Sequence, residues 1–196
     1  MTLTEYLTRR NACGPSIPWV AGRPASEALW RECPAASWML WLYAKVGVRR
    51  ELMVLCGTGC VRSALHLVPP GEDRPRLAVA VAEAWAYGRA TLEEVRAAAN
   101  AANAAARAAT YATYAGSATY AATAAAAHAA YTAAEDAAYV ARVAYRAAYL
   151  AATAAAEAGI CTREHALARY ARGVREVIPW WHVADRLRAA GVEVER

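Results

Sequence analysis

The chain has 196 residues, of which 58% are hydrophobic, and its formal net charge is +5. This length suits one domain and is sufficient to bury a substantial core. The charges are spread along the chain without a long block of one sign, so the composition does not predict a nucleic-acid-binding protein. Between Arg107 and Glu135 there is no charge, but there is also no strongly apolar residue, which argues against a membrane span.

The first half of the chain predicts short helices separated by glycine and proline. Thr2 and Glu5 have the spacing of a capping box, which predicts a helix that extends to about Ala12. We expect a loop over 14–24, rich in glycine and proline, and then helices over 26–33, 34–47, 48–68 and 71–87. Gly57 and Gly59 lie inside the most apolar of these helices, and we interpret them as a point of close approach by a neighbouring helix.

Alanine dominates the following segment, with 35 alanines among the 62 residues from 97 to 158. Alanine has the highest helix propensity of all residues, so this composition predicts long helices. Thr91 and Glu94 form a second capping-box pattern at the start of the segment, and Gly159 closes it. We expect helices over 92–115 and 117–158, with a break near 130 as the alternative to one long second helix.

The alanine-rich helices are amphipathic, although their apolar face consists of methyl groups. If 133–158 is one helix, its inner face is formed by Ala133, Ala137, Val140, Ala144, Ala148, Ala151 and Ala155. The opposite face is formed by Tyr131, Glu135, Tyr139, Arg142, Arg146, Tyr149, Thr153 and Glu157. Because alanine is small, we expect neighbouring helices to approach toward the lower end of the usual range of about 8–10 Å between axes.

The chain is predicted to end in two further helices. Thr162 begins one that continues to Ile178, Pro179 breaks it, and 180–191 form a final short helix that Trp180 and Trp181 anchor. The outward arginines of the first of these helices are interpreted as a solvated basic face; they are Arg163, Arg169, Arg172 and Arg175. The predicted fold class is therefore all-α, a multi-helix bundle with long, closely packed alanine-rich helices.

We treat 1–196 as a single helical domain. Its half over 1–90 is rich in tryptophan and leucine, 91–159 form the long alanine-rich helices, and 160–196 form the C-terminal helices.

The sequence contains no recognisable catalytic or metal-binding motif. Cys56 and Cys60 could face one metal ion together with Cys13 and Cys33, but the CxxC spacing is absent and buried packing is the preferred interpretation. There is no HExxH pair, no phosphate-binding loop and no GxSxG turn. We therefore predict a protein that is not an enzyme and has no cofactor or metal. The five cysteines and the polar start of the chain, which lacks the pattern of a signal peptide, favour the cytoplasm.

The most informative surface is the line of tyrosine and arginine on the alanine-rich helix. Both residue types are enriched at the energetically important positions of protein interfaces. We predict a partner-binding surface formed by Tyr131, Tyr139, Arg142, Arg146 and Tyr149. The alternative is that these tyrosines lie over adjoining helices and complete the core, and the sequence leaves both interpretations open.

Two blocks of the chain resemble a known family. They are CPAASWMLWL at 33–42 and the segment from GEDRPR to AWAYG at 71–88, preceded by NAC at 11–13 and followed by the alanine- and tyrosine-rich helices. This pattern resembles the immunity proteins of bacterial polymorphic toxin systems, which also occur in phage genomes. The resemblance implies a protein that binds and neutralises a cognate toxin, and it supplies no catalytic residues. A structural or self-assembling helical protein, phage-associated and forming homo-oligomers, is the first alternative, and a nucleic-acid binder is the second.

Overall fold

The computed structural model describes residues 1–12, 14–112, 117–134 and 137–195, with the side chains of all of these except 110–112, 117 and 137–139. Its regular structure is helical apart from one isolated bridge between Ala25 and Val194. The helices are α1 (Leu3–Arg9), α2 (Ser16–Val20), α3 (Glu27–Glu32), α4 (Ala36–Val46), α5 (Arg50–Arg62), η1 (Leu65–Leu67), α6 (Arg74–Ala86), α7 (Leu92–Ala112), α8 (Ser117–Ala134), α9 (Ala137–Glu157), α10 (Arg163–Val177) and α11 (Trp180–Ala189). The all-α fold class is therefore confirmed.

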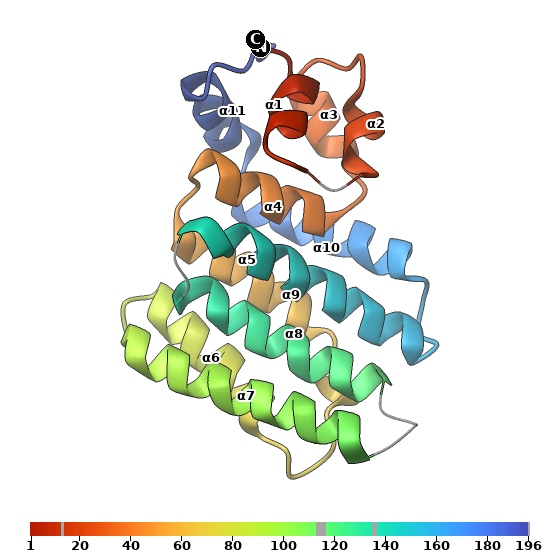
Figure 1. Cartoon of the computed structure of the whole chain (residues 1–196), viewed down its shortest axis with the longest axis vertical. Coiled ribbons are helices and arrows are strands. Elements are labelled where there is room, and N and C mark those ends of the chain that lie inside the picture. Colours follow the sequence, from red (N-terminus) through yellow and green to blue (C-terminus); the bar gives the residue numbers. More distant parts are fainter. Residues whose placement is uncertain (13, 113–116, 135–136, 196) are drawn as a thin grey trace.

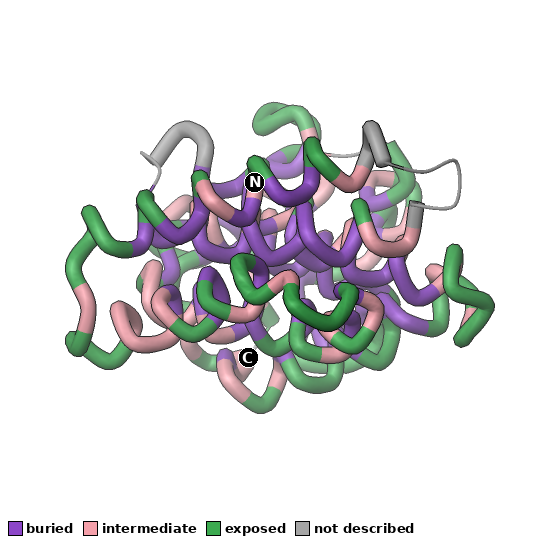
Figure 2. The backbone as a smooth tube through the Cα atoms, turned by 90° about the horizontal axis from the view of Figure 1, so that it is seen from below, coloured by how far each residue is buried: buried purple, intermediate pink, exposed green. Residues whose placement is uncertain are grey.

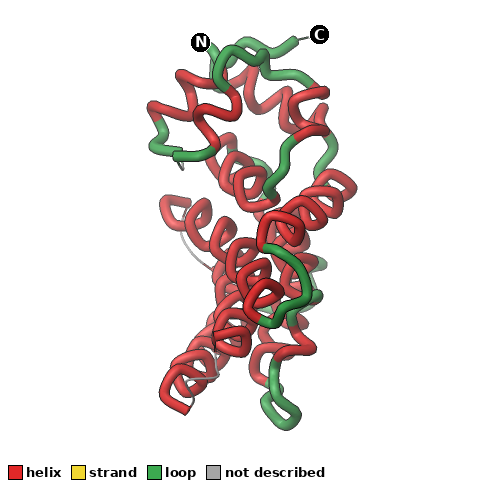
Figure 3. Tube along the Cα trace, turned by 90° about the vertical axis from the view of Figure 1, so that its right-hand side faces the viewer, coloured by secondary structure: helices red, strands yellow, loops and turns green. Residues whose placement is uncertain are grey.

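The longer helices form a two-layered stack. One layer contains α4, α9, α8 and α7 side by side in that order, and the other contains α10, α5 and α6 (Figures 1 and 3). Each helix of the second layer contacts two neighbours of the first: α10 lies against α4 and α9, α5 against α9 and α8, and α6 against α8 and α7. This arrangement places α8 and α9 in the middle of the molecule, with neighbours on both sides and behind.

A cap of short helices covers the α4 end of the stack. It consists of α1, α2, α3 and α11, so it combines both ends of the chain (Figure 1). The amino group of Met1 donates a hydrogen bond to the carbonyl of Gly191 at 2.8 Å, and the amide of Glu193 donates to the carbonyl of Met1 at 2.9 Å. The hydroxyl of Tyr6 in α1 donates to the carbonyl of Lys45 at 3.0 Å, which ties the cap to the end of α4.

Alanine allows α8 to be buried on nearly all sides. The alanines at 122, 125, 126, 129, 130 and 133 have no exposed surface, and buried segments run through the middle of the stack (Figure 2). Four helices approach α8 because a methyl group takes little space, and many close contacts then replace the usual large side chains. Arg50 from α5 and Arg96 from α7 donate to the carbonyls of Ala133 and Ala134, at 3.1 and 3.2 Å, and so complete the last turn of α8.

Local sequence signals locate most helix ends correctly. The capping boxes of Thr2 with Glu5 and of Thr91 with Glu94 are both formed, and the hydroxyl of Thr162 accepts the amide hydrogen of His165 at the start of α10. Gly47, Gly88 and Gly159 follow α4, α6 and α9, and each has a positive φ, as a C-terminal glycine requires.

Three expected boundaries were wrong. The loop expected over 14–24 contains α2, because Pro15 and Pro18 lie before it and in its first turn, where proline is compatible with a helix. The helix expected over 48–68 ends at Arg62 and is followed by η1. Residues 133–158 do not form one helix: α8 ends at Ala134 and α9 begins at Ala137, later than the alternative break near 130.

Gly57 of α5 faces α8 and α9, as expected for a close approach, but a side chain as large as a methyl fits there. A Cβ atom at this position would lie 3.9 Å from the Cβ atoms of Ala129 and Ala147, which is an ordinary contact distance. We therefore expect Gly57→Ala to raise the free energy of unfolding by about 0.5–1 kcal/mol, because alanine favours the helical backbone. Chemical denaturation would measure the change.

Two control variants test this interpretation of Gly57. Gly59 is exposed, with nothing within 4 Å of the position of a Cβ atom, so Gly59→Ala should give a similar gain from the backbone alone. Gly57→Leu should be destabilising because the space holds only one methyl group. A loss of stability in Gly57→Ala would show that the three helices already touch at this point.

Candidate binding surface on helices α8 and α9

The predicted partner-binding residues lie on two helices instead of one. Tyr131 belongs to α8, whereas Tyr139, Arg142, Arg146 and Tyr149 belong to α9. The side chain of Tyr139 lies outside the described residues. The two helices pack against each other, and His128 of α8 lies close to Tyr131 and near Arg142 and Arg146 of α9. Arg142 and Arg146 are exposed, while Tyr131 and Tyr149 are half-buried.

Part of the Tyr131 side chain makes contacts within the molecule. Its hydroxyl donates a hydrogen bond to Oδ1 of Asn100 on α7 at 2.7 Å, and the residue packs against the buried alanine cluster of α6, α7 and α8. Its ring also meets the ring of His128 edge to face, with 6.4 Å between centroids. Tyr131 therefore joins α8 to α7 and presents only part of its side chain to a partner.

Tyr149 stands in a stack of three side chains from α9 and α10. Its ring is nearly parallel to that of Tyr145, with 5.6 Å between centroids and an interplanar angle of 14°. The guanidinium carbon of Arg163 lies 5.0 Å from the centroid of Tyr149, so a cation–π contact completes the stack. Tyr145 and Arg163 extend the predicted set. The spacing of Tyr145, four residues before Tyr149, could have identified it, but nothing local places Arg163 beside them.

His128 lies on α8 next to the arginines of α9. The residue is half-buried, and its Nδ1 is buried with no hydrogen-bond partner among the described residues. Burial lowers the pKa of His128, and the positive charges of Arg146 and Arg142 lower it further, to about 4. The ring is therefore neutral near pH 7, and the positive charge of this surface is carried by the arginines.

We refer to Tyr131, Arg142, Tyr145, Arg146, Tyr149 and Arg163 together as the Tyr–Arg surface. It combines three guanidinium groups with three aromatic rings on rigid helices. Arg163 has a carboxylate nearby, that of Glu164 at 3.6 Å, whereas no described carboxylate lies within 4.0 Å of Arg146. This combination suits contact with an acidic surface, since arginine both pairs with carboxylates and stacks on rings.

The cysteines of α5 lie in the core. Cys56 and Cys60 are buried, and burial raises the pKa of both thiols, that of Cys60 to about 12. They are therefore neutral, whereas a metal-binding cysteine must be a thiolate. In the described part of the chain, no three histidine, cysteine or acidic side chains are grouped so as to hold a metal ion. Cys13 lies outside that part.

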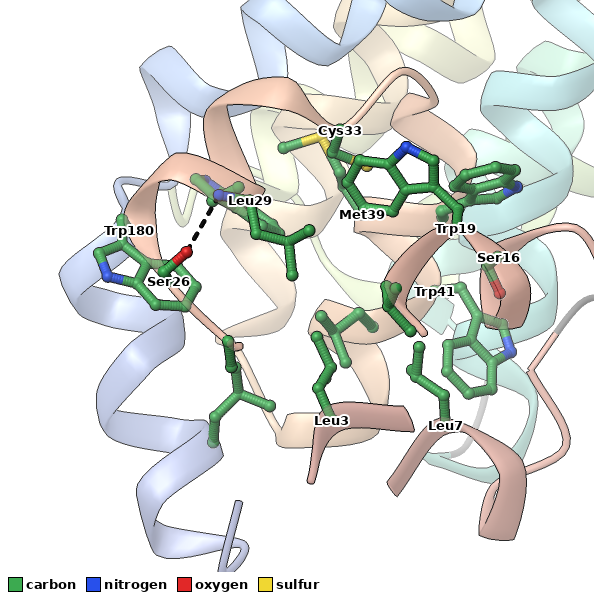
Figure 4. Close-up of a pocket in the computed structure, with 16 residues that line it drawn as sticks. Leu3, Leu7, Ser16, Trp19, Ser26, Leu29, Cys33, Met39, Trp41 and Trp180 are labelled. Carbon is green, nitrogen blue, oxygen red and sulfur yellow. Dashed lines mark hydrogen bonds between the residues drawn. The ribbon is translucent and has the colours of Figure 1, made fainter. Parts of the chain in front are cut away.

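The cap encloses a second candidate, an apolar pocket lined by tryptophan. Side chains from α1, α2, α3, α4 and α11 converge on it, including Trp19, Trp30, Trp38, Trp41 and Trp180 (Figure 4). Trp30 and Trp180 are in contact, with 6.0 Å between ring centroids, which anchors α11. Trp181 does not take part as expected, because it is 64% exposed and lies beside His182.

This pocket is better described as loosely packed core than as a ligand chamber. Its cavity volume is only about 50 Å³. Its one unsatisfied polar atom is Nε1 of the buried Trp30, which has no hydrogen-bond partner among the described residues. The tryptophans therefore serve mainly to hold the cap on α4.

Within the described residues, no helix combines the length and the apolar character that crossing a bilayer requires. No family model, curated protein or solved structure matches this chain.

Proposed function

We propose that this chain is a non-enzymatic binding protein that docks on another protein through the Tyr–Arg surface. In the manner of the immunity proteins that it resembles, it would neutralise a toxin by covering part of the toxin's surface. The observation that carries the proposal is the stack of Arg163, Tyr149 and Tyr145 beside the exposed Arg142 and Arg146. The described cysteines form no disulfide, which is compatible with action in the reducing cytoplasm.

The chemistry of the surface favours an acidic partner. Arg142, Arg146 and Arg163 supply positive charge. His128, near Arg142 and Arg146, is neutral, so the charge is carried by arginine side chains, which can pair with carboxylates. The stacked tyrosines add a broad, amphipathic contact area whose position is set before binding, so little conformational entropy is lost. The alanine-rich helices below are tightly packed, which keeps this surface rigid.

Self-assembly through unmatched alanine faces has less support. The inner alanines of α9 at 144, 147, 148, 151 and 152 have no exposed surface, as is the case for those of α8. They are covered by the chain's own helices and are therefore not available to a second copy.

The proposal predicts that reversing the charge of this surface weakens partner binding. The double variant Arg142→Glu, Arg146→Glu should reduce the affinity for an acidic toxin encoded by the neighbouring gene by about tenfold or more, because like charges would then face each other. Tyr149→Ala should also weaken binding, since it removes the centre of the stack. Surface plasmon resonance with the purified full-length chain would measure both changes.

The matched control reverses two exposed arginines of the cap, as Arg9→Glu, Arg186→Glu, which changes the net charge equally and should leave the affinity nearly unchanged. Circular dichroism would confirm that all variants remain folded. If the double variant at Arg142 and Arg146 bound every identified partner as tightly as the control variant, the Tyr–Arg surface would not be the docking site.

A further inference from the structure

A polar groove lies between the cap and α10, which belongs to the second layer of the stack. It measures about 580 Å³, within the size range of small-molecule sites. One wall is the turn between α3 and α4, and the other is one face of α10. The charged and titratable side chains that line the groove include Arg31, Glu32, His165, Arg169, Arg172 and Arg175.

The net positive charge of the groove comes from α10. Glu32, its one acidic residue, is paired with Arg23, and Arg31 is paired with Glu27, so these two charges are neutralised by residues outside the groove. The other three arginines lie on α10. No described carboxylate comes within ion-pair distance of Arg169, Arg172 or Arg175.

Arg175 provides a fixed positive charge in this groove. It is half-buried, and its Nη1 donates hydrogen bonds to the carbonyls of Trp30 and Cys33, at 3.3 and 3.2 Å, where α3 ends. These carbonyls orient the guanidinium but carry no full negative charge. Arg172, one turn away on α10, and Arg169, nearly two turns away, are exposed, and the guanidinium carbon of Arg169 lies 5.5 Å from the centroid of the Tyr170 ring.

We propose that this groove binds a compact anion with several phosphate groups. Arginine recognises phosphate through paired, charge-assisted hydrogen bonds, and three such side chains without acidic partners lie on one wall. The basic stretch from His165 to Arg175 spans about 15 Å along the helix. Glu164 and Glu176 flank it in the sequence, and this restricts the ligand to a few phosphates instead of a long nucleic acid.

This site is independent of the proposed docking function, because it shares no residue with the Tyr–Arg surface. The arginines were expected to form a solvated basic face; Arg169 and Arg172 are exposed, but Arg175 is half-buried and bonded to carbonyls, and Arg163 stacks on Tyr149. The structure adds the opposite wall, which the sequence could not predict, and so converts an exposed stripe into a groove.

The test is isothermal titration calorimetry of the full chain with sodium tripolyphosphate in low-salt buffer. We expect saturable binding with one site, and Arg172→Ala should weaken it about tenfold, since one charge-assisted contact is lost. The double variant Arg169→Ala, Arg172→Ala should weaken it further. Arg186→Ala, an exposed arginine of the cap, serves as the matched control and should bind as the unchanged chain does.

Each alternative outcome has a clear meaning. The absence of binding, or an equal loss in Arg172→Ala and Arg186→Ala, would overturn the proposal by showing no site or only general attraction to a basic protein. Oligothymidylates of increasing length distinguish the source of the phosphates. If their affinity rises steadily with length and exceeds that of tripolyphosphate, the groove belongs to a nucleic-acid interface and the compact ligand is excluded.

Discussion

Replacing Ala129 with leucine should lower the free energy of unfolding by about 3 kcal/mol, at the upper end of the usual cost of overpacking. Ala129 has no exposed surface and lies in the middle of α8, opposite Gly57 of α5. Leucine adds three carbon atoms at a point where the backbones of α8 and α5 leave space at Gly57 for only about one methyl group. Those backbones cannot move apart without separating α8 from α5, and urea denaturation would measure the loss.

The control for this prediction is the same substitution at an exposed alanine. Ala104 lies on α7 and is exposed, and leucine has nearly the helix propensity of alanine. Ala104→Leu should therefore change the free energy of unfolding by no more than about 0.5 kcal/mol. A small effect for both variants would mean that the alanine-rich helices are loosely packed.

Lowering the pH from about 6.5 to about 4 should destabilise the fold through His128. The pKa of this residue is about 4 in the folded chain, against an ordinary value of 6.5. In this interval the unfolded chain takes up a proton that the folded chain does not, so stability falls as the pH falls. The full difference corresponds to about 3 kcal/mol, and denaturation at a series of pH values would measure it.

His128→Gln isolates this contribution, because glutamine does not titrate and the variant should lose the slope between pH 4.5 and 6.5. Glu72 and Glu94, whose pKa values are lowered from 4.5 by hydrogen bonds with Arg74 and Thr91, contribute mainly below that interval and are present in both chains. Arg146→Gln should raise the pKa of His128, as followed by NMR of the ring hydrogens. A titration of His128 near 6.5 in the unchanged chain would contradict the prediction.

Local sequence patterns predicted only part of the candidate binding surface. The spacing of Arg142, Arg146 and Tyr149 placed them on one polar line, and all three lie at exposed or half-buried positions of α9. Tyr131 was assigned to the same helix, but it belongs to α8, where it donates a hydrogen bond to α7. Helix periodicity alone cannot reveal that α8 and α9 are separate helices, because alanine, with its high helix propensity, is frequent in both.

Local sequence patterns predict the all-α class, most helix ends and the polar line of α9. These depend on local physics, namely the high helix propensity of alanine, the hydrogen bonds of capping threonines and the positive φ that glycine adopts. Three features depend on tertiary packing: the end of α8, the contact of Arg163 with Tyr149, and the second wall that faces the arginines of α10. One alanine face closely resembles another, so the local sequence does not determine which helices pack together. The pairing of helices depends on how all of them fit in the stack.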